Sequence, residues 1–340
     1  MTELIVHRIG GACTVQDSGR AGYLDHGLSR SGAADFLALR EGAALLGNDS
    51  ALAAMELPGF GGEFEATEDT RIALSGAPMQ VAIDGEALAW NAVHFLGRGQ
   101  RLTVGAARSG VYGYLHVAGG FDTPSILGSR SSHLTAGLGH AVQVGDHLPI
   151  GPARSGPTGL TLDVSDRFSG GTVRIVDSVQ TALFPEDVRQ RFEDTAFRRG
   201  PRANRMGVQL ASDGPGFSAE GQLNILSEVI VPGDIQMTGD GNPFVLLPEC
   251  QTTGGYPRIG TVIPCDMPVV AQAPAGARLQ FKFVTLDAAL AAQRGFAASV
   301  AALAAARRPL IRRAEDIADL LSYQLIGGMI SAHGDEGERT

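Results

Sequence analysis

The chain almost lacks lysine. Lys282 is the only lysine among its 27 basic residues, and the others are arginine. A phosphate-binding loop of the GxxxxGK[ST] kind needs a lysine beside glycines, and no such segment occurs. We therefore expect that any nucleotide or biotin in its function is held by another chain.

Cysteine and long apolar runs are also scarce. The three cysteines, Cys13, Cys250 and Cys265, have no metal-type spacing. No apolar run approaches the roughly twenty residues that span a bilayer, and the first residues lack the layout of a signal peptide. The net charge of −9 argues against nucleic acid or an anionic membrane as partner. These features favour a cytoplasmic protein.

Glycine and proline are abundant, with 46 and 17 residues spread along the chain. They divide it into short, alternating segments, a pattern typical of β structure with many turns. The best linker candidate covers residues 151–171, after which a second β-rich region begins. We therefore predict one domain over residues 1–155, a second over 156–286 and an alanine-rich helical extension over 287–340.

Few helices are expected. Residues 31–46 carry a helical apolar stripe, with Ser31 as N-cap and Gly47 as the C-terminal stop. A short helix is predicted over residues 185–195, with Pro185 in its first turn. The alanine-rich segment from Asp287 predicts a helix that ends by Pro309, and residues 312–326 predict another.

The most informative segment covers residues 248–260, PECQTTGGYPRIG. Polar side chains followed by two glycines lie just after an apolar run that reads as a buried strand. Glycine permits a positive φ and close backbone approach to a ligand, whereas a simple turn between strands rarely needs so many hydrogen-bonding groups. We expect a ligand cradle here, with a tight turn as the alternative. Its candidate substrate-binding residues are Thr252, Thr253, Gly254, Gly255 and Tyr256, with Gln251 as a candidate catalytic residue.

A second polar cluster, TVQDSGRAGY, covers residues 14–23. Arg20 can bind a carboxylate or phosphate, or it can pair with Asp17 in a structural salt bridge. Ser31 opens a predicted helix whose free amides suit an anion, although capping alone explains a serine there. The further candidates are Gln16, Arg130, Arg205 and Gln236.

Other chemistries find less support. His133, His140 and His147 recur every seven residues, but in a glycine-broken segment without a completing carboxylate, so we expect no metal site. The G-x-S-x-G elbow of serine hydrolases is absent from the sequence. Nothing in the spacing selects an acid or base among the carboxylates Glu228, Asp234, Asp240 and Asp266.

In this order, the segments TVQDSGRAGY (14–23), SGAAD (31–35), LHVAGG (115–120), GSRS (128–131), RMG (205–207) and QTTGGYPRIG (251–260) resemble the biotin-dependent carboxyltransferase family. This family is also called allophanate hydrolase subunit 2. The resemblance covers about residues 1–285. It implies a mainly β fold with two cyclophilin-like β-barrel domains, a few short helices and a helical C-terminal tail.

The resemblance also implies a function within a complex. The family includes the C subunit of bacterial ATP-dependent 5-oxoprolinase, which works with an allophanate hydrolase subunit 1-like partner and a third, LamB/YcsF-type subunit to open 5-oxoproline to glutamate. An alternative is transfer of a carboxyl group to urea or a similar amide from carboxybiotin carried by a partner chain. A further alternative is a non-catalytic, KipA-like regulator. The isolated chain is expected to have little or no activity.

For the leading interpretation, lactam opening requires phosphorylation of the carbonyl oxygen and attack by water. Arg20, Arg130 and Arg205 would balance phosphate or carboxylate charge, Asp17 would orient Arg20 or a water, and residues 251–256 would hold the amide. Asn204 departs from the family pattern, in which aspartate commonly precedes RMG, and His26 departs at a position that is usually apolar or aromatic.

Overall fold

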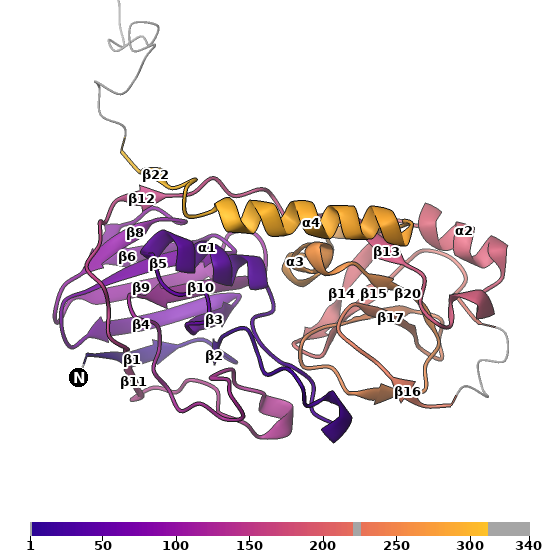
Figure 1. Cartoon of the computed structure of the whole chain (residues 1–340), viewed down its shortest axis with the longest axis horizontal. Coiled ribbons are helices and arrows are strands. Elements are labelled where there is room, and N and C mark those ends of the chain that lie inside the picture. The colour runs from indigo at the N-terminus through magenta and orange to yellow at the C-terminus, as the bar shows by residue number, and fades with distance from the viewer. Residues whose placement is uncertain (1, 220–225, 312–340) are drawn as a thin grey trace, which may run out of the picture.

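The first half of the chain folds into two antiparallel sheets. The computed structural model describes residues 2–219 and 226–311 (Figure 1). One sheet has the order β11 (His147–Pro149), β1 (Glu3–Ile9), β4 (Phe60–Ala66), β9 (Arg101–Ala107), β6 (Met79–Ile83), β7 (Glu86–Ala87). The other has the order β2 (Thr14–Gln16), β3 (Ala54–Pro58), β10 (Tyr112–Val117), β5 (Thr70–Gly76), β8 (Val93–Leu96). Alternate residues of β1, such as Leu4 and Val6, enter the core that both sheets share.

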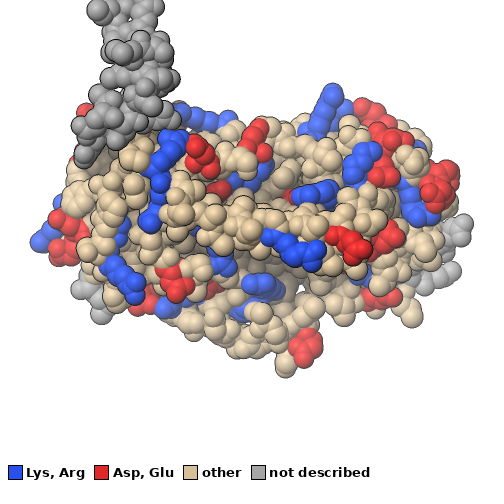
Figure 2. All heavy atoms as spheres, turned by 45° about the horizontal axis from the view of Figure 1, so that its top comes forward, with Lys and Arg blue, Asp and Glu red and all other residues tan. Residues whose placement is uncertain are grey.

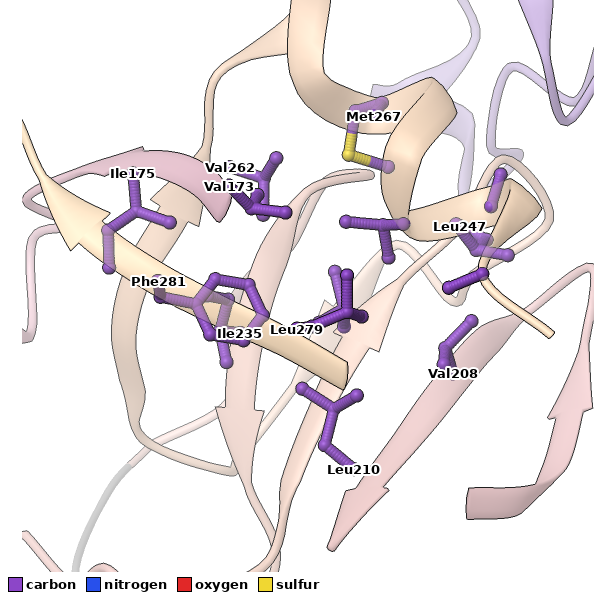
Figure 3. Close-up of a cluster of buried hydrophobic side chains, with 14 of the residues drawn as sticks. Val173, Ile175, Val208, Leu210, Ile235, Leu247, Val262, Met267, Leu279 and Phe281 are labelled. Carbon is purple, nitrogen blue, oxygen red and sulfur yellow. The ribbon is translucent and has the colours of Figure 1, made fainter. Parts of the chain in front are cut away.

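The second half contains a closed seven-stranded barrel. Its order is β13 (Gly170–Val176), β20 (Arg258–Val262), β17 (Asp234–Met237), β18 (Pro243–Leu246), β15 (Gly207–Ala211), β14 (Phe197–Asn204), β21 (Arg278–Phe283). The parallel pair β13–β21 helps to close it. Figure 3 shows Val173, Ile235, Leu279 and neighbouring apolar side chains gathered inside. The predicted mainly β fold is confirmed.

Helix α1 (Phe36–Leu46) begins later than the sequence suggested. The prediction of Ser31 as its N-cap was wrong, because Asp35 is the N-cap and accepts a hydrogen bond from the amide of Ala38 at 3.0 Å. Ser31 instead has a φ of 54° and donates its hydroxyl to another loop. The predicted end is confirmed, because Gly47 adopts the left-handed conformation there.

The other helices are α2 (Glu186–Asp194), α3 (Met267–Gln272) and α4 (Leu286–Ala302). Short 3-10 turns are η1 (Leu24–His26), η2 (Leu134–Ala136), η3 (Thr181–Leu183) and η5 (Pro264–Asp266). The predicted helices at 185–195 and after residue 286 are thus present, whereas residues 312–326 lie outside the described part. No helix in residues 2–219 and 226–311 is long and apolar enough to cross a membrane.

Helix α4 spans both halves of the molecule (Figure 1). It packs Phe296 against Phe36 of α1, with ring centroids 5.5 Å apart. Beyond it, β22 (Arg308–Pro309) pairs with β12 (Leu160–Thr161) beside the first half. The face that carries α4 shows basic and acidic side chains interspersed without a patch of one sign (Figure 2).

The two halves also share an interior. One apolar cluster joins α1 and β10 residues, such as Leu39 and Tyr114, to the barrel core. Gln272 of α3 accepts hydrogen bonds from the backbone amides of residues 111 and 112 at 2.9 Å and donates to Asp35 at 2.8 Å. Since apolar packing and buried polar bonds both cross the junction, we infer that the two halves hold a fixed relative position.

Candidate functional site

A polar cleft of about 430 Å³ lies where the two halves meet. One wall comes from residues 27–29 together with His133 and η2. The other wall comes from the loop after β18. The lining residues are Gly27, Leu28, Ser29, His133, Thr135, Ala136, Met206, Glu249, Cys250, Gln251, Thr252 and Thr253. The predicted ligand loop thus supplies a wall of a real concavity.

The small ribbon of β16 (Glu228–Val229) and β19 (Thr253–Gly254) holds this loop. The amide of Ile230 donates to the carbonyl of Thr252 at 3.0 Å. Gln251, Thr252 and Thr253 line the cleft, whereas Gly255 and Tyr256 lie beyond it, and Tyr256 is 49% exposed. The structure therefore brings together only the first half of the predicted QTTGGY set.

Gly254 serves close packing. Neither Gly254 nor Gly255 has a positive φ, contrary to the property that singled them out. A Cβ at Gly254 would lie 2.6 Å from Nε2 of Gln236, so a larger residue would displace that side chain. Gln236 is buried beneath the ribbon, away from the cleft lining, and its Nε2 has no partner in the described part of the chain.

Asp17 organises the loop on the other side of the site. Its carboxylate accepts hydrogen bonds from the hydroxyls of Ser129 and Ser131, at 2.6 and 2.5 Å, and from the amides of Gly19 and Arg130, at 2.8 and 2.7 Å. Burial opposes its ionisation, but these hydrogen bonds outweigh burial and lower its pKa. Among the described residues, no ion pair joins it to Arg20, so the alternative of a direct salt bridge was wrong.

Arg20 is buried and incompletely paired. Its Nη2 donates to the carbonyl of Ser131, whereas its Nη1 has no hydrogen-bond partner among residues 2–219 and 226–311. Desolvation lowers its pKa, and the charges of Asp17 and Glu249 oppose that change. An unpaired guanidinium nitrogen in a buried position is costly, and a group that accepts its proton in a hydrogen bond would relieve that cost.

Arg205 connects the two halves. Its Nε donates to Glu249 at 2.5 Å, its Nη2 to the carbonyl of Gly32 at 2.6 Å, and its Nη1 to Glu56. Burial would lower its pKa, but the two carboxylates raise it above the usual value. Because protein groups occupy these donors, this geometry points to a structural clamp rather than to the phosphate contact predicted for Arg205.

The remaining predicted residues separate into two places. Ser31 Oγ and Gln16 Nε2 both donate to the carbonyl of Ser132, at 2.8 and 3.1 Å, behind the cleft wall. Arg130 instead pairs with Asp122 and lines a different hollow of about 210 Å³. The structure therefore does not bring Arg130 to the cleft.

Three cleft residues escaped the sequence-based prediction. Ser29 Oγ lies 2.8 Å from Nε2 of His133, and Nδ1 of that ring lies 3.9 Å from Oε2 of Glu249. Burial lowers the pKa of His133, as do the charges of Arg20 and Arg205, against the opposite effect of Glu249. Glu249 stood inside the conspicuous PECQTTGGYP segment and His133 in the histidine series, but nothing in the sequence connected them to Ser29.

The four carboxylates among which the sequence selected no acid or base lie outside the cleft lining. Glu228 and Asp234 pair with Arg258, and Asp266 pairs with Arg174. Asp240 accepts bonds within its own turn. The described residues contain no group of three or more His, Cys, Asp or Glu side chains placed to hold a metal ion.

The comparisons with known proteins agree with one another. A family described as "Carboxyltransferase domain, subdomain A and B" matches residues 26–283. The chain is 34% identical to the C subunit of 5-oxoprolinase from Escherichia coli K12, over 86% of this chain and 94% of that one. It is 28% identical to the urea amidolyase of Lachancea kluyveri, over 80% of this chain but 16% of that longer protein. The Kluyveromyces lactis urea carboxylase structure shares the fold, with a TM-score of 0.81 at 24% identity, covering 88% of this chain and 29% of that one.

Proposed function

Since the chain belongs to the carboxyltransferase subdomain A and B family, we propose that it is the C-type subunit of an ATP-dependent 5-oxoprolinase. Such a complex opens the cyclic amide 5-oxoproline to glutamate. This chain and its E. coli relative match over most of their lengths, which supports a correspondence between whole subunits. The junction cleft is the observation that carries the proposal, because its hydroxyl, amide and imidazole groups suit a small polar lactam.

The chemistry assigns separate tasks to the complex and to this chain. The phosphoryl group of ATP would pass to the lactam oxygen, and a first water would add to the carbonyl carbon. Cleavage of the ring C–N bond would then leave an acyl phosphate, from which a second water would release phosphate and give glutamate. Gln251, Thr252 and Thr253 would bind the amide, and Arg20, which is buried outside the cleft lining, would stabilise developing negative charge from a distance through its positive charge. Asp17 would act indirectly, by fixing the Ser129–Ser131 loop beside Arg20.

ATP and the other reacting groups require partner chains in this proposal. We assign these roles to an allophanate hydrolase subunit 1-like protein and a LamB/YcsF-type subunit, in the cytoplasm, where the buried free thiols of Cys13, Cys250 and Cys265 would stay reduced. We also propose residues 1–155, 156–286 and 287–340 as its functional units.

Carboxyl transfer is the second candidate, because the chain is also similar to urea amidolyase. The same cleft would then hold the flat ureido ring of biotin on a carrier chain. That function requires a biotinylated protein and a biotin carboxylase in the purified complex.

The proposal is tested by coexpressing the chain with the genes next to its own and measuring ADP and glutamate released from 5-oxoproline and ATP. We expect equal amounts of both products, with release lost when this chain is omitted. A stable complex without release would contradict the proposal. Avidin detection of a biotinylated member would then favour carboxyl transfer, and stoichiometric binding without turnover would favour a regulator.

A further inference from the structure

Nδ1 of His133 accepts a hydrogen bond, and this bond fixes the tautomer of the ring. His133 is the N-cap of η2, and the backbone amide of Ala136 donates to its Nδ1 at 3.3 Å. Oε2 of Glu249 lies 3.9 Å from the same nitrogen, which is beyond hydrogen-bond distance. A ring nitrogen that accepts a hydrogen bond carries no proton, so the neutral ring has its proton on Nε2.

The environment of His133 favours this neutral form. Burial lowers the pKa of the ring, as do the charges of Arg20 and Arg205, against the opposite effect of Glu249. A second proton, on Nδ1, would also break the hydrogen bond from Ala136. We therefore expect a ring that is neutral near pH 7 and donates through Nε2.

Ser29 consequently keeps a hydroxyl proton without an acceptor. Its Oγ lies 2.8 Å from Nε2 of His133, and this is the only hydrogen bond of that hydroxyl within residues 2–219 and 226–311. Since Nε2 donates in this bond, the hydroxyl proton itself is free to turn toward another group. The side chain is 4% exposed and lines the cleft. A buried donor without an acceptor is costly, and a ligand oxygen in the cleft would remove that cost.

We propose that Ser29 is a substrate-binding residue whose hydroxyl donates to the carbonyl oxygen of a neutral amide in the cleft, and that His133 is its positioning residue. This inference rests on the proposed function and deepens it, since it names a residue that recognises the lactam oxygen of 5-oxoproline. The contact forms when the substrate binds, before the phosphoryl group reaches that oxygen. Neither Ser29 nor His133 gains or loses a proton in this role.

The rest of the cleft lining suits the neutral end of the substrate. With His133 neutral, Glu249 is the one charged side chain among the described lining residues, and Arg205 holds its Oε1 at 2.5 Å. No arginine or lysine in the described part of the chain lines the cleft, so a substrate carboxylate finds no cation there. The lactam end would therefore face Ser29, and the carboxylate of 5-oxoproline would point out of the cleft.

Steady-state kinetics of the coexpressed complex with Ser29→Ala tests the inference. We expect KM for 5-oxoproline to rise about tenfold with kcat nearly unchanged, because one hydrogen bond to the bound substrate is lost. The analogue with sulfur in place of the lactam oxygen is a weaker acceptor, so its inhibition constant should change less than about twofold. An equal rise in both constants would overturn the inference, because it would show a general disturbance of the cleft.

Variants of His133 separate a donor from a base. His133→Phe removes the Nε2 donor and should raise KM about as much as Ser29→Ala does, whereas His133→Gln keeps an N–H group near that position and should raise it less. A loss of kcat that is equally large in both variants would overturn the positioning role. His140→Gln is the matched control, because that side chain is 68% exposed and pairs with Asp146.

A second measurement does not depend on the variants folding. The ¹⁵N shifts of His133 in the wild-type complex should show the proton on Nε2, whereas a proton on Nδ1 would overturn the inference. An active wild-type complex together with an unchanged KM in a folded Ser29→Ala complex would also overturn it, with the proposed function intact. An inactive wild-type complex would instead contradict the proposed function and this inference with it.

Discussion

Arg205 shows how much a single side chain contributes at the junction. Its guanidinium binds Glu249, Glu56 and the carbonyl of Gly32. The side chains of Arg205, Glu249 and Glu56 are all buried. Glu56 also accepts the hydroxyl of Tyr114 at 2.6 Å. Such a buried ionic group adds little net stability compared with apolar packing, but loss of one member leaves the others unpaired.

Arg205→Ala should therefore lower the free energy of unfolding by about 3–5 kcal/mol, because Glu56 and Glu249 would remain buried without their cation. Urea denaturation followed by circular dichroism measures this change. Arg198→Ala is the matched control from β14, the strand that ends just before Arg205, since Arg198 forms an exposed pair with Asp213 and should matter little. Equal effects of the two substitutions would contradict the clamp.

Asp17→Asn should lower the free energy of unfolding by about 2 kcal/mol at pH 7, because an amide cannot accept all four donors that surround the carboxylate. The folded pKa of Asp17 is below its ordinary value of 3.8, so its stabilisation is present above that value and is lost as pH falls through the folded pKa. The difference in the free energy of unfolding between wild type and variant should therefore become smaller in acid. A difference that does not change with pH would refute this assignment.

At the scale of elements, α4 bridges the two halves by few side chains. Leu286 and Leu290 are exposed, at 66% and 46%, so the larger apolar residues near its start do not form the contact face. Ala289, Ala292 and Phe296 pack against the barrel side or α1 instead. The helix was predictable from its composition, but its buried face was not, because alanine packs on either side equally well.

Phe296→Ala should lower the free energy of unfolding by about 1–2 kcal/mol, less than for a fully enclosed phenylalanine, because the ring is half-buried against Phe36. Thermal unfolding of this variant and of Leu290→Ala compares two apolar side chains of one helix. Leu290→Ala should leave the midpoint almost unchanged. Equal shifts would mean that α4 packs by another face.

Local patterns predicted local structure well. Glycine-separated short segments indicated the strands, and Gly47 indicated the end of α1. Ser31 misled because serine caps helices so often, whereas the tertiary contact with Ser132 gives it another role. Gly254 was selected because glycine permits a positive φ, but its φ is not positive. Its small size matters instead, because the side chain of Gln236 packs against it.

At the scale of the whole molecule, the site depends on long-range contacts. Ser31 and Glu249 are 218 residues apart and yet their side chains lie 3.4 Å from each other. A sequence motif identified the wall that carries residues 251–253, because polar residues in a glycine-rich turn are visible locally. The motifs did not identify the opposite wall, residues 27–29 and 133–136, so His133 was considered only as a metal ligand. Arg130 was grouped with the other predicted site residues, although it lines another hollow.

The central claim is that this junction cleft binds the substrate amide within an oxoprolinase complex. Steady-state kinetics of the complex assembled with Gln251→Ala tests it most directly, with exposed Gln143→Ala as the matched control. Loss of one amide hydrogen bond predicts a KM for 5-oxoproline about tenfold higher, with the complex still assembled and the control unchanged. A folded, assembled Gln251→Ala complex with wild-type KM and kcat would contradict the account.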